Sequence, residues 1–421
     1  MTNLVKIDDT LANKISYYHI ALLMASLPFD MFYSHLITVS FGLHTLIHVS
    51  KKNIQPIFTW RMLALLSVFF VSVLSAIYTS NAKGAGDEIG RRATVVILPL
   101  LLCLNPTDLN KYRARLFFWF STVCTVVIVY LYADALLTIR HFHLPLRTLF
   151  SGTFANHNFS EPINIHATFF SMQVALALIF LLSALVKETV RYKQIIYLIG
   201  ALILTAGLIQ LSSKSVFIAL FVIINVALPY FILKGNGRKR YVLVSASLTV
   251  LLIAGILWSN TFRERYVTEL TADLTPAKSG EVLDSRLARW SVIVDLIVKK
   301  PMTGYGAGAE IGLLHNSFFE HKLYNSFLHD LNSHNQYLSF MLKSGIGGLL
   351  IYIATLAFGM TISIRQSDLL FFSFMLMIVT VSFSENFLDV DKGIIYYVFF
   401  FSFFMLSNGK ENKEHVSLKL P

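Results

Sequence analysis

The chain has 421 residues, of which 55% are hydrophobic and only 14% are charged. Soluble globular proteins carry about 25% charged residues, so this composition excludes an ordinary water-soluble domain. The net charge of +11 does not indicate a nucleic-acid-binding protein, because most lysines and arginines lie in short connectors between apolar segments and not on one face of a soluble domain. The composition is typical of an integral membrane protein.

The apolar residues form twelve blocks, many of them near the length of about 20 residues that spans a hydrocarbon core. The blocks fall near 16–29, 31–48, 60–78, 92–105, 116–138, 166–186, 194–211, 215–233, 241–258, 335–360, 367–384 and 393–407. Backbone polar groups in lipid must be hydrogen-bonded within their own segment, so we expect each block to be a helix. The first two blocks are either two short helices or one re-entrant hairpin around Pro28 and Asp30.

The N-terminal segment and the two cysteines agree with this prediction of membrane helices. Lys6 and Lys14 precede the first block as in a signal sequence, but no cleavage site of small residues follows, so we expect a retained first helix. Cys103 and Cys124 lie inside apolar blocks, which favours core packing and predicts no disulfide or metal framework.

The distribution of positive charge predicts the orientation of the helices. If the N-terminus is cytoplasmic and all twelve blocks cross, the cytoplasmic segments carry 19 lysines and arginines, and the short outer connectors carry seven. This bias follows the positive-inside rule and places both termini in the cytoplasm. The predicted organisation is nine helices within 1–258, an outer loop over 259–334, three helices within 335–408 and a cytoplasmic tail over 409–421. The fold class is an all-α polytopic membrane bundle of about twelve transmembrane helices.

Two outer segments are too long to be simple connectors, 139–165 and 259–334. Long loops without structure of their own are uncommon, and they are often functional. Within the second, Leu287, Trp290, Val294 and Ile297 recur at helical spacing. We expect short amphipathic helices lying over the membrane surface, and no separate domain.

Ionisable residues are scarce inside the apolar blocks. The deepest is Lys343, which either faces the bundle or extends to the interface. This scarcity disfavours an ion-coupled transporter, because such proteins carry charge along their pathways. Arg91 and Arg92 lie in an outer connector, where they serve either topology or an anionic substrate.

The polar residues whose side chains suit catalysis or ligand binding lie instead in the outer segments. Lys214 begins an apolar block and is either an interfacial lysine or part of a site. Arg286 and Arg289 lie on the predicted loop helix, and arginine suits bidentate phosphate binding. His334 closes the loop at the membrane boundary, and histidine is suited to proton transfer near neutral pH.

Two further patterns are less specific. Gly304-Tyr305-Gly306-Ala307-Gly308 resembles a phosphate-cradling turn, but no Lys-Ser/Thr pair follows it, so a flexible loop is the default interpretation. Three other histidines, at 315, 321 and 329, raise the question of zinc. Their spacings form no tight helical pair and no cysteine or acidic ligand set accompanies them, so we expect no metal.

The motifs between Asp284 and Gly348 resemble those of bacterial O-antigen ligases, a group that also includes O-antigen polymerases. They are Ser285-Arg286-Leu-Ala-Arg-Trp290, then Pro301 with Gly304-Tyr-Gly306, then Ser333-His334-Asn335-Gln-Tyr-Leu338, and then Gly345-Ile-Gly-Gly348. The first 200 residues resemble the family only in hydropathy.

The resemblance implies a glycosyltransferase of the GT-C type in the bacterial inner membrane. It would take glycan from undecaprenyl pyrophosphate and transfer it to the lipid A–core of lipopolysaccharide on the periplasmic face, with inversion and without metal or cofactor. The family's catalytic histidine falls on His334, supported by Asn335, and its loop arginine falls on Arg286 or Arg289. A second family arginine is replaced here by Lys214, which keeps the charge but loses the bidentate fork.

Three alternatives stay open. A polymerase would use the same architecture and differ only in its acceptor, which would be another carrier-linked repeat. A transporter for lipid-linked sugars would carry inverted repeats or broken, charged helices, and neither is evident. A membrane scaffold without catalysis would not depend on His334.

Overall fold

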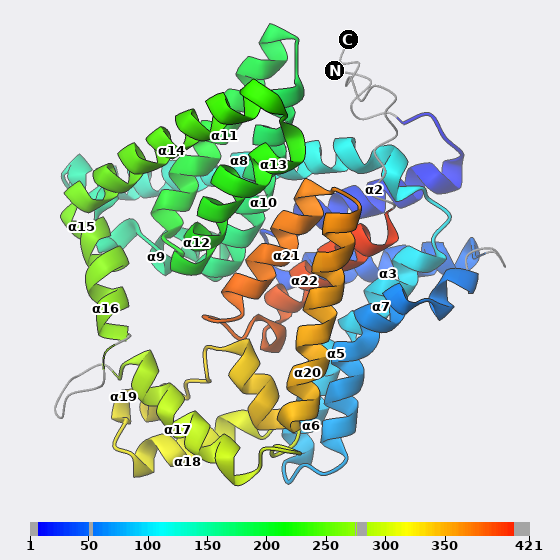
Figure 1. Cartoon of the computed structure of the whole chain (residues 1–421), viewed down its shortest axis with the longest axis vertical. Helices are drawn as coiled ribbons and strands as arrows, with labels where there is room; N and C mark the ends of the chain where they lie inside the picture. Colours follow the sequence, from blue (N-terminus) through cyan, green and yellow to red (C-terminus); the bar gives the residue numbers. More distant parts are fainter. Residues whose placement is uncertain (1–6, 50–53, 274, 276–283, 408–421) are drawn as a thin grey trace.

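The computed structural model describes residues 7–49, 54–273, 275 and 284–407, and every regular element in these ranges is helical (Figure 1). Five of the described helices are long and apolar enough to cross a membrane. They span Leu109–His141, Ala167–Lys187, Arg191–Leu211, Lys214–Ile232 and Gln336–Arg365. The predicted all-α class and the presence of several potential membrane spans are confirmed. The predicted tail, 409–421, lies outside the described residues.

Each of the twelve apolar blocks coincides with a helix. In chain order these are α2 (Leu11–Ser26), α3 (Met31–Ile47), α5 (Trp60–Ala76), α7 (Thr94–Leu104), α8 (Leu109–His141), α10 (Ala167–Lys187), α11 (Arg191–Leu211), α12 (Lys214–Val222) continued by α13 (Leu228–Ile232), α14 (Gly235–Trp258), α20 (Gln336–Arg365), α21 (Leu369–Val381) and α22 (Asp391–Leu406). The first two blocks form separate helices, because the Asp30 side chain accepts a hydrogen bond from the Phe32 amide and caps α3.

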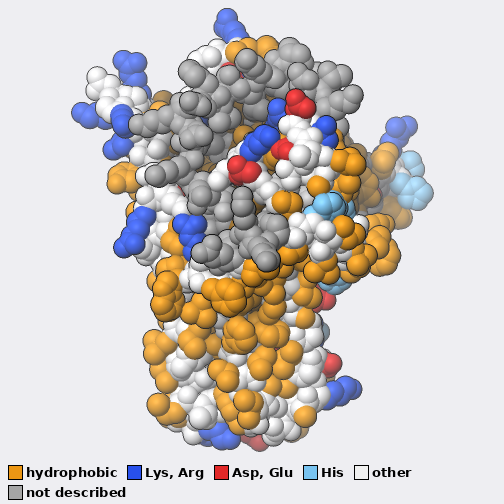
Figure 2. Space-filling model, turned by 90° about the vertical axis from the view of Figure 1, so that its right-hand side faces the viewer, with side chains coloured by type: hydrophobic (Ala, Val, Ile, Leu, Met, Phe, Trp, Pro, Cys, Tyr) orange, Lys and Arg blue, Asp and Glu red, His pale blue; other side chains and the backbone are white. Residues whose placement is uncertain are grey.

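Two helices form the centre of the bundle. α10 is buried from Ala167 to Leu181, and α22 is buried from Gly393 to Met405. Phe117 of α8 stacks against Phe404 and Phe180, so aromatic side chains fill the space between these elements. The peripheral helices expose apolar side chains, and Figure 2 shows hydrophobic residues covering much of the lower part of one face. A lipid environment suits such a surface.

The second half of the predicted outer loop, 284–334, contains α17 (Arg286–Lys299), α18 (Glu310–Glu320) and α19 (Tyr324–Leu328). The predicted amphipathic helix is confirmed, but its predicted apolar face is wrong in part. Leu287 and Val294 are exposed, whereas the buried face is formed by Val292, Ile293, Leu296 and Ile297. These side chains share a small core with Leu342 of α20, so α17 packs against that helix.

The loop is joined to α20 by backbone hydrogen bonds at a break in that helix. Gly345 has φ 62° and ψ −164°, and a Cβ atom there would lie 2.2 Å from the Met302 carbonyl oxygen, so only glycine fits. The break leaves the carbonyl groups of Leu342 and Lys343 available, and they accept from the amides of Tyr305 at 2.9 Å and Gly306 at 2.8 Å. Residues 301–306 thus replace part of the hydrogen bonding of the helix.

The first part of the predicted outer loop is a helical arm that extends from α14. It consists of α15 (Asn260–Arg263), a π-helical turn at Glu264–Thr268, and α16 (Glu269–Asp273). In Figure 1 this arm descends from the end of α14 toward the α17–α19 region. It carries acidic side chains toward the cations described below.

Candidate functional site

His334 lies in the short segment between α19 and α20, in a left-handed backbone conformation with φ 43°. Its side chain is 27% exposed, which leaves the ring accessible to a substrate. The next residue, Asn335, caps α20 because its side-chain oxygen accepts hydrogen bonds from the amides of Tyr337 and Leu338. Asn335 therefore helps to fix the start of α20 directly after His334.

The side-chain partner of His334 is Glu385, in the turn between α21 and α22. Nδ1 of His334 lies 3.5 Å from Oε2 of Glu385, and the Thr168 hydroxyl donates to Oε1 at 3.4 Å. Burial of Glu385 favours its neutral form, but the contact with His334 and the nearby charges of His166 and Arg286 outweigh it, and the pKa of Glu385 falls to about 2. A charged carboxylate therefore faces the histidine ring at neutral pH.

The predicted phosphate-binding cations Lys214 and Arg286 meet at the acidic side chains of α16. Oδ2 of Asp273 lies 3.5 Å from Nε of Arg286 and 3.9 Å from Nζ of Lys214. Glu269 Oε2 lies 3.5 Å from the same lysine nitrogen. Arg286 also donates through Nη1 to the Ser384 carbonyl at 3.1 Å, beside Glu385. Residues from three separate segments are thus brought to one place.

Arg289 is the least satisfied of these cations. It is 6% exposed, and its Nε and Nη1 atoms make no hydrogen bond within the described part of the chain. Burial and the charge of Arg286 lower the pKa of Arg289 to about 10. The nearby carboxylates only partly offset this lowering; they belong to Asp273, Asp284 and Glu385. A buried guanidinium with unused donors is costly, and such groups gather where an anionic ligand completes the coordination.

The glycine-rich segment 304–308 is a packed structural loop. The amides of Tyr305 and Gly306 are bonded to α20, the Ala307 amide donates to the Ser75 carbonyl, and the Gly308 amide donates to Glu88 at 3.0 Å. No row of free amides remains in this segment to bind phosphate. The segment is therefore neither phosphate-cradling nor loose, and its glycines permit close contact with neighbouring backbone.

The three other loop histidines do not gather. Nδ1 of His315 lies 2.6 Å from Asp330, whereas His321 and His329 are bonded to the carbonyl groups of Ser317 and Asn325. Among the described residues, no group of three or more His, Cys, Asp or Glu side chains is arranged to hold a metal ion.

A second group of charges lies buried beside the His334 segment, where the sequence predicted a largely apolar interior. We call it the ionic core; its members are Glu88, Arg92, Glu310, Lys343 and Asp389. Arg92 contacts Glu88 at 2.8 Å and Asp389 at 2.6 Å, and Lys343 contacts Asp389 at 2.8 Å, Glu88 at 3.4 Å and Glu310 at 3.7 Å. Lys343 therefore faces the bundle, and Arg92 faces neither the substrate region nor solvent. Arg91 is exposed.

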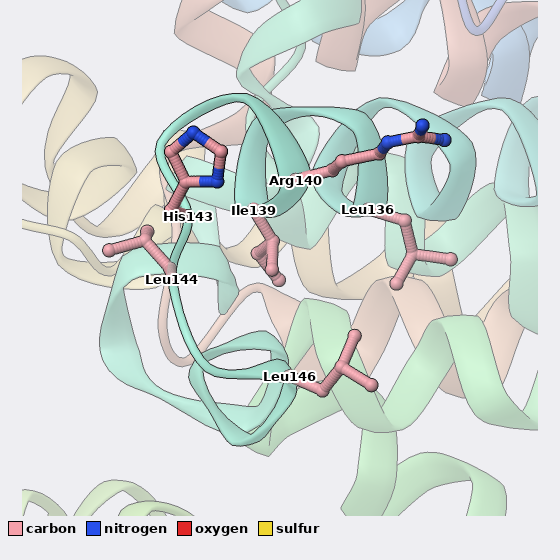
Figure 3. Close-up of a pocket in the computed structure, with 6 residues that line it drawn as sticks. All are labelled: Leu136, Ile139, Arg140, His143, Leu144 and Leu146. Carbon is pink, nitrogen blue, oxygen red and sulfur yellow. The ribbon is translucent and has the colours of Figure 1, made fainter.

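A hollow of about 470 Å³ lies elsewhere, at the end of α8. In Figure 3, Leu136 and Ile139 extend toward Leu146, while the His143 ring and the Arg140 guanidinium lie on the opposite side. We call the group formed by His334, Glu385, Lys214, Arg286 and Arg289 the His334 cluster. None of the residues that line the hollow belongs to it. Its open, aliphatic character suits contact with lipid chains.

Sequence reasoning missed Glu385 and the ionic core. The available signal for Glu385 was an acidic residue in the short outer turn between two apolar blocks. For the ionic core it was the coincidence of Lys343, Arg92 and Asp389 at the outer ends of three blocks. Neither signal identifies a partner, because the paired residues are far apart in the chain.

Comparison with known proteins gives one match. Residues 199–353 match a family model described as O-antigen ligase, and this stretch contains Lys214, both loop arginines and His334 but not Glu385. No curated protein matches the chain. The predicted resemblance is therefore confirmed: residues 199–353 of this helical chain match the O-antigen ligase family.

Proposed function

We propose that the protein transfers glycan from undecaprenyl pyrophosphate to the lipid A–core of lipopolysaccharide, at the periplasmic face of the bacterial inner membrane. The observation that carries this proposal is the convergence of a His334–Glu385 pair with three cations, one of them buried with unused donors. The match to the O-antigen ligase family supports the lipid-linked glycan as substrate. The proposed topology has twelve crossings and both termini in the cytoplasm, which places this cluster outside.

The cations bind the pyrophosphate of the donor. Arg289 supplies unused N–H groups, while Arg286 and Lys214 now bind the α16 carboxylates, which a pyrophosphate of higher charge would replace. Positive charge held in a partly buried site stabilises the negative charge that develops as the carrier pyrophosphate leaves. Because three side chains supply this charge, no metal ion or other cofactor is required.

His334 acts as the general base on the acceptor. It takes the proton from the acceptor hydroxyl as the oxygen attacks the anomeric carbon and the bond from that carbon to the pyrophosphate oxygen breaks. The charged Glu385 stabilises the imidazolium that forms. This single displacement inverts the anomeric configuration.

Transfer by reconstituted protein tests the proposal. The purified chain in lipid bilayers receives undecaprenyl-pyrophosphate glycan and purified lipid A–core, and the products are separated and quantified. His334→Ala should lower transfer by about 10²- to 10⁴-fold, the usual contribution of a positioned general base. His329→Ala is the matched control, since His329 is an exposed loop histidine outside the cluster.

The products also separate the alternatives. Elongation of the carrier-linked glycan without a lipid A product would show a polymerase that uses the same residues. Full transfer by His334→Ala would overturn the assignment of the base. Movement of intact donor across the bilayer without any bond cleavage would indicate a transporter.

A further inference from the structure

The side chain of Asn386 binds both residues that flank His334, at the hydroxyl of Ser333 and at the backbone amide of Asn335. Its Oδ1 atom accepts hydrogen bonds from the Asn335 amide at 2.7 Å and from the Ser333 hydroxyl at 3.1 Å. Asn386 is 3% exposed and directly follows Glu385 in the turn between α21 and α22. Two neighbouring residues of one turn therefore meet His334, one at its ring and the other at its flanking backbone.

Glu310 of α18 holds Asn386 in place. Its Oε1 atom accepts from the Asn386 amide group at 2.9 Å and from the Ser333 amide at 3.0 Å, and its other oxygen accepts from the Ser339 hydroxyl. Lys343 lies 3.7 Å away and supplies positive charge to the carboxylate. The orientation of the Asn386 amide is thereby determined, because only its NH₂ group can face the carboxylate while its oxygen faces Ser333 and Asn335.

We propose that Asn386 and Glu310 are positioning residues for the reaction, and that together they set the distance between His334 and Glu385. We call this pair the clamp. His334 has a positive φ, a conformation that costs a non-glycine residue free energy and persists only where the surroundings enforce it. The hydrogen bonds of the clamp to residues 333 and 335 provide this enforcement. The Trp290 indole donates a further hydrogen bond, to the Ser333 carbonyl at 2.9 Å.

The clamp explains how His334 and Glu385, which are 51 positions apart in the chain, hold a catalytic geometry. Glu385 lies 3.5 Å from the imidazole, and a contact of this length would not orient the ring by itself. Because Asn386 fixes the backbone beside the ring and is adjacent to Glu385, a displacement of the turn moves both partners together. The inference rests on the proposed function for its kinetic consequence, but the geometry it describes does not depend on that function.

The kinetic test compares Asn386→Ala with Asn105→Ala in the glycan-transfer assay. Asn105 is a matched control, since it is a buried asparagine that bonds Ser16 and Thr45 away from the cluster. Asn386→Ala should lower kcat about 10- to 100-fold, because small misplacements of a catalytic group cost this much, and leave KM for the donor unchanged. Asn105→Ala should lower the melting temperature and leave kcat of the folded protein unchanged.

Exchanging the amide and the carboxylate between positions 386 and 310 distinguishes a positioning role from a general loss of structure. Asn386→Asp alone places two carboxylates together and should be at least as slow as Asn386→Ala. Adding Glu310→Gln restores one amide and one carboxylate in exchanged places, and should recover kcat at least threefold over Asn386→Asp. A double variant no faster than the single one, or an Asn386→Ala enzyme within twofold of the wild-type kcat, would overturn the clamp.

An assay without turnover distinguishes failure of the clamp from failure of the proposed function. Carbethoxylation of His334 by diethyl pyrocarbonate is followed by peptide mass spectrometry, with the exposed His143 as internal reference. The ratio of the two rates should rise several-fold in Asn386→Ala and stay unchanged in Asn105→Ala. If the wild type transfers no glycan, the proposed function fails while this ratio still decides the clamp. An unchanged ratio in Asn386→Ala would refute the clamp.

Discussion

The ionic core and the His334 cluster are both partly buried groups of cations and carboxylates, yet their charges are satisfied to different degrees. In the ionic core, Arg92 and Lys343 each contact at least two carboxylates within 4 Å. In the His334 cluster, Nε and Nη1 of Arg289 make no hydrogen bond within the described residues.

The difference separates charges that maintain structure from charges that are available to a ligand. A buried ion pair is tolerated when hydrogen bonds complete it, and removal of one partner is then strongly destabilising. A buried cation with unused donors weakens the fold, and under the proposed function an anion binds it. The two groups should therefore respond to mutation in opposite ways.

Of the variants that compare the two groups, Arg289→Ala should have the largest effect on activity. Loss of the guanidinium removes charge that stabilises the leaving pyrophosphate, and transfer should fall by about 10²- to 10³-fold. The melting temperature should stay the same or rise, because an unsatisfied buried charge disappears. Lys299→Ala, at the exposed end of the same helix, serves as control. Loss of stability with little loss of activity would place Arg289 with the structural charges.

Lys343→Met should show the reverse pattern. It leaves Asp389, Glu88 and Glu310 with one cation fewer, and the free energy of unfolding should fall by about 3–5 kcal/mol. Thermal unfolding in detergent measures the loss, and transfer by the protein that remains folded should change much less than in Arg289→Ala. A stable Lys343→Met protein without activity would instead assign Lys343 a role in the reaction.

The smallest effect concerns the pH dependence of Glu385. Its folded pKa of about 2 lies below its ordinary value of 4.5, so its charge stabilises the fold above pH 4.5, and this contribution is lost as the pH falls toward 2. The difference in melting temperature between wild type and Glu385→Gln should be a few degrees and constant above pH 4.5, and should shrink below it. Glu320→Gln, on the exposed end of α18, should show no such change. A difference that grows on acidification would contradict the ion pair with His334.

The sequence predicted the helices well because each apolar block carries its own signal of length and hydropathy. It also predicted that Lys214, Arg286 and His334 act together, although only through resemblance to a family. Glu385 escaped prediction because its partner lies 51 positions earlier and local pattern does not report tertiary pairing. The face of α17 was partly misjudged for a related reason. Its core is formed with Leu342, so tertiary packing and not helical spacing decides which side is buried.

The break at Gly345 has a consequence for exchanging parts between related proteins. The outer loop lends backbone donors to α20, and the Ile346 amide in turn donates to the Pro301 carbonyl at 2.9 Å. A graft that ends at His334 would leave these groups facing a foreign helix. The unit that can be transplanted to alter acceptor choice should therefore extend through Gly348, as one continuous cassette of loop and half-helix.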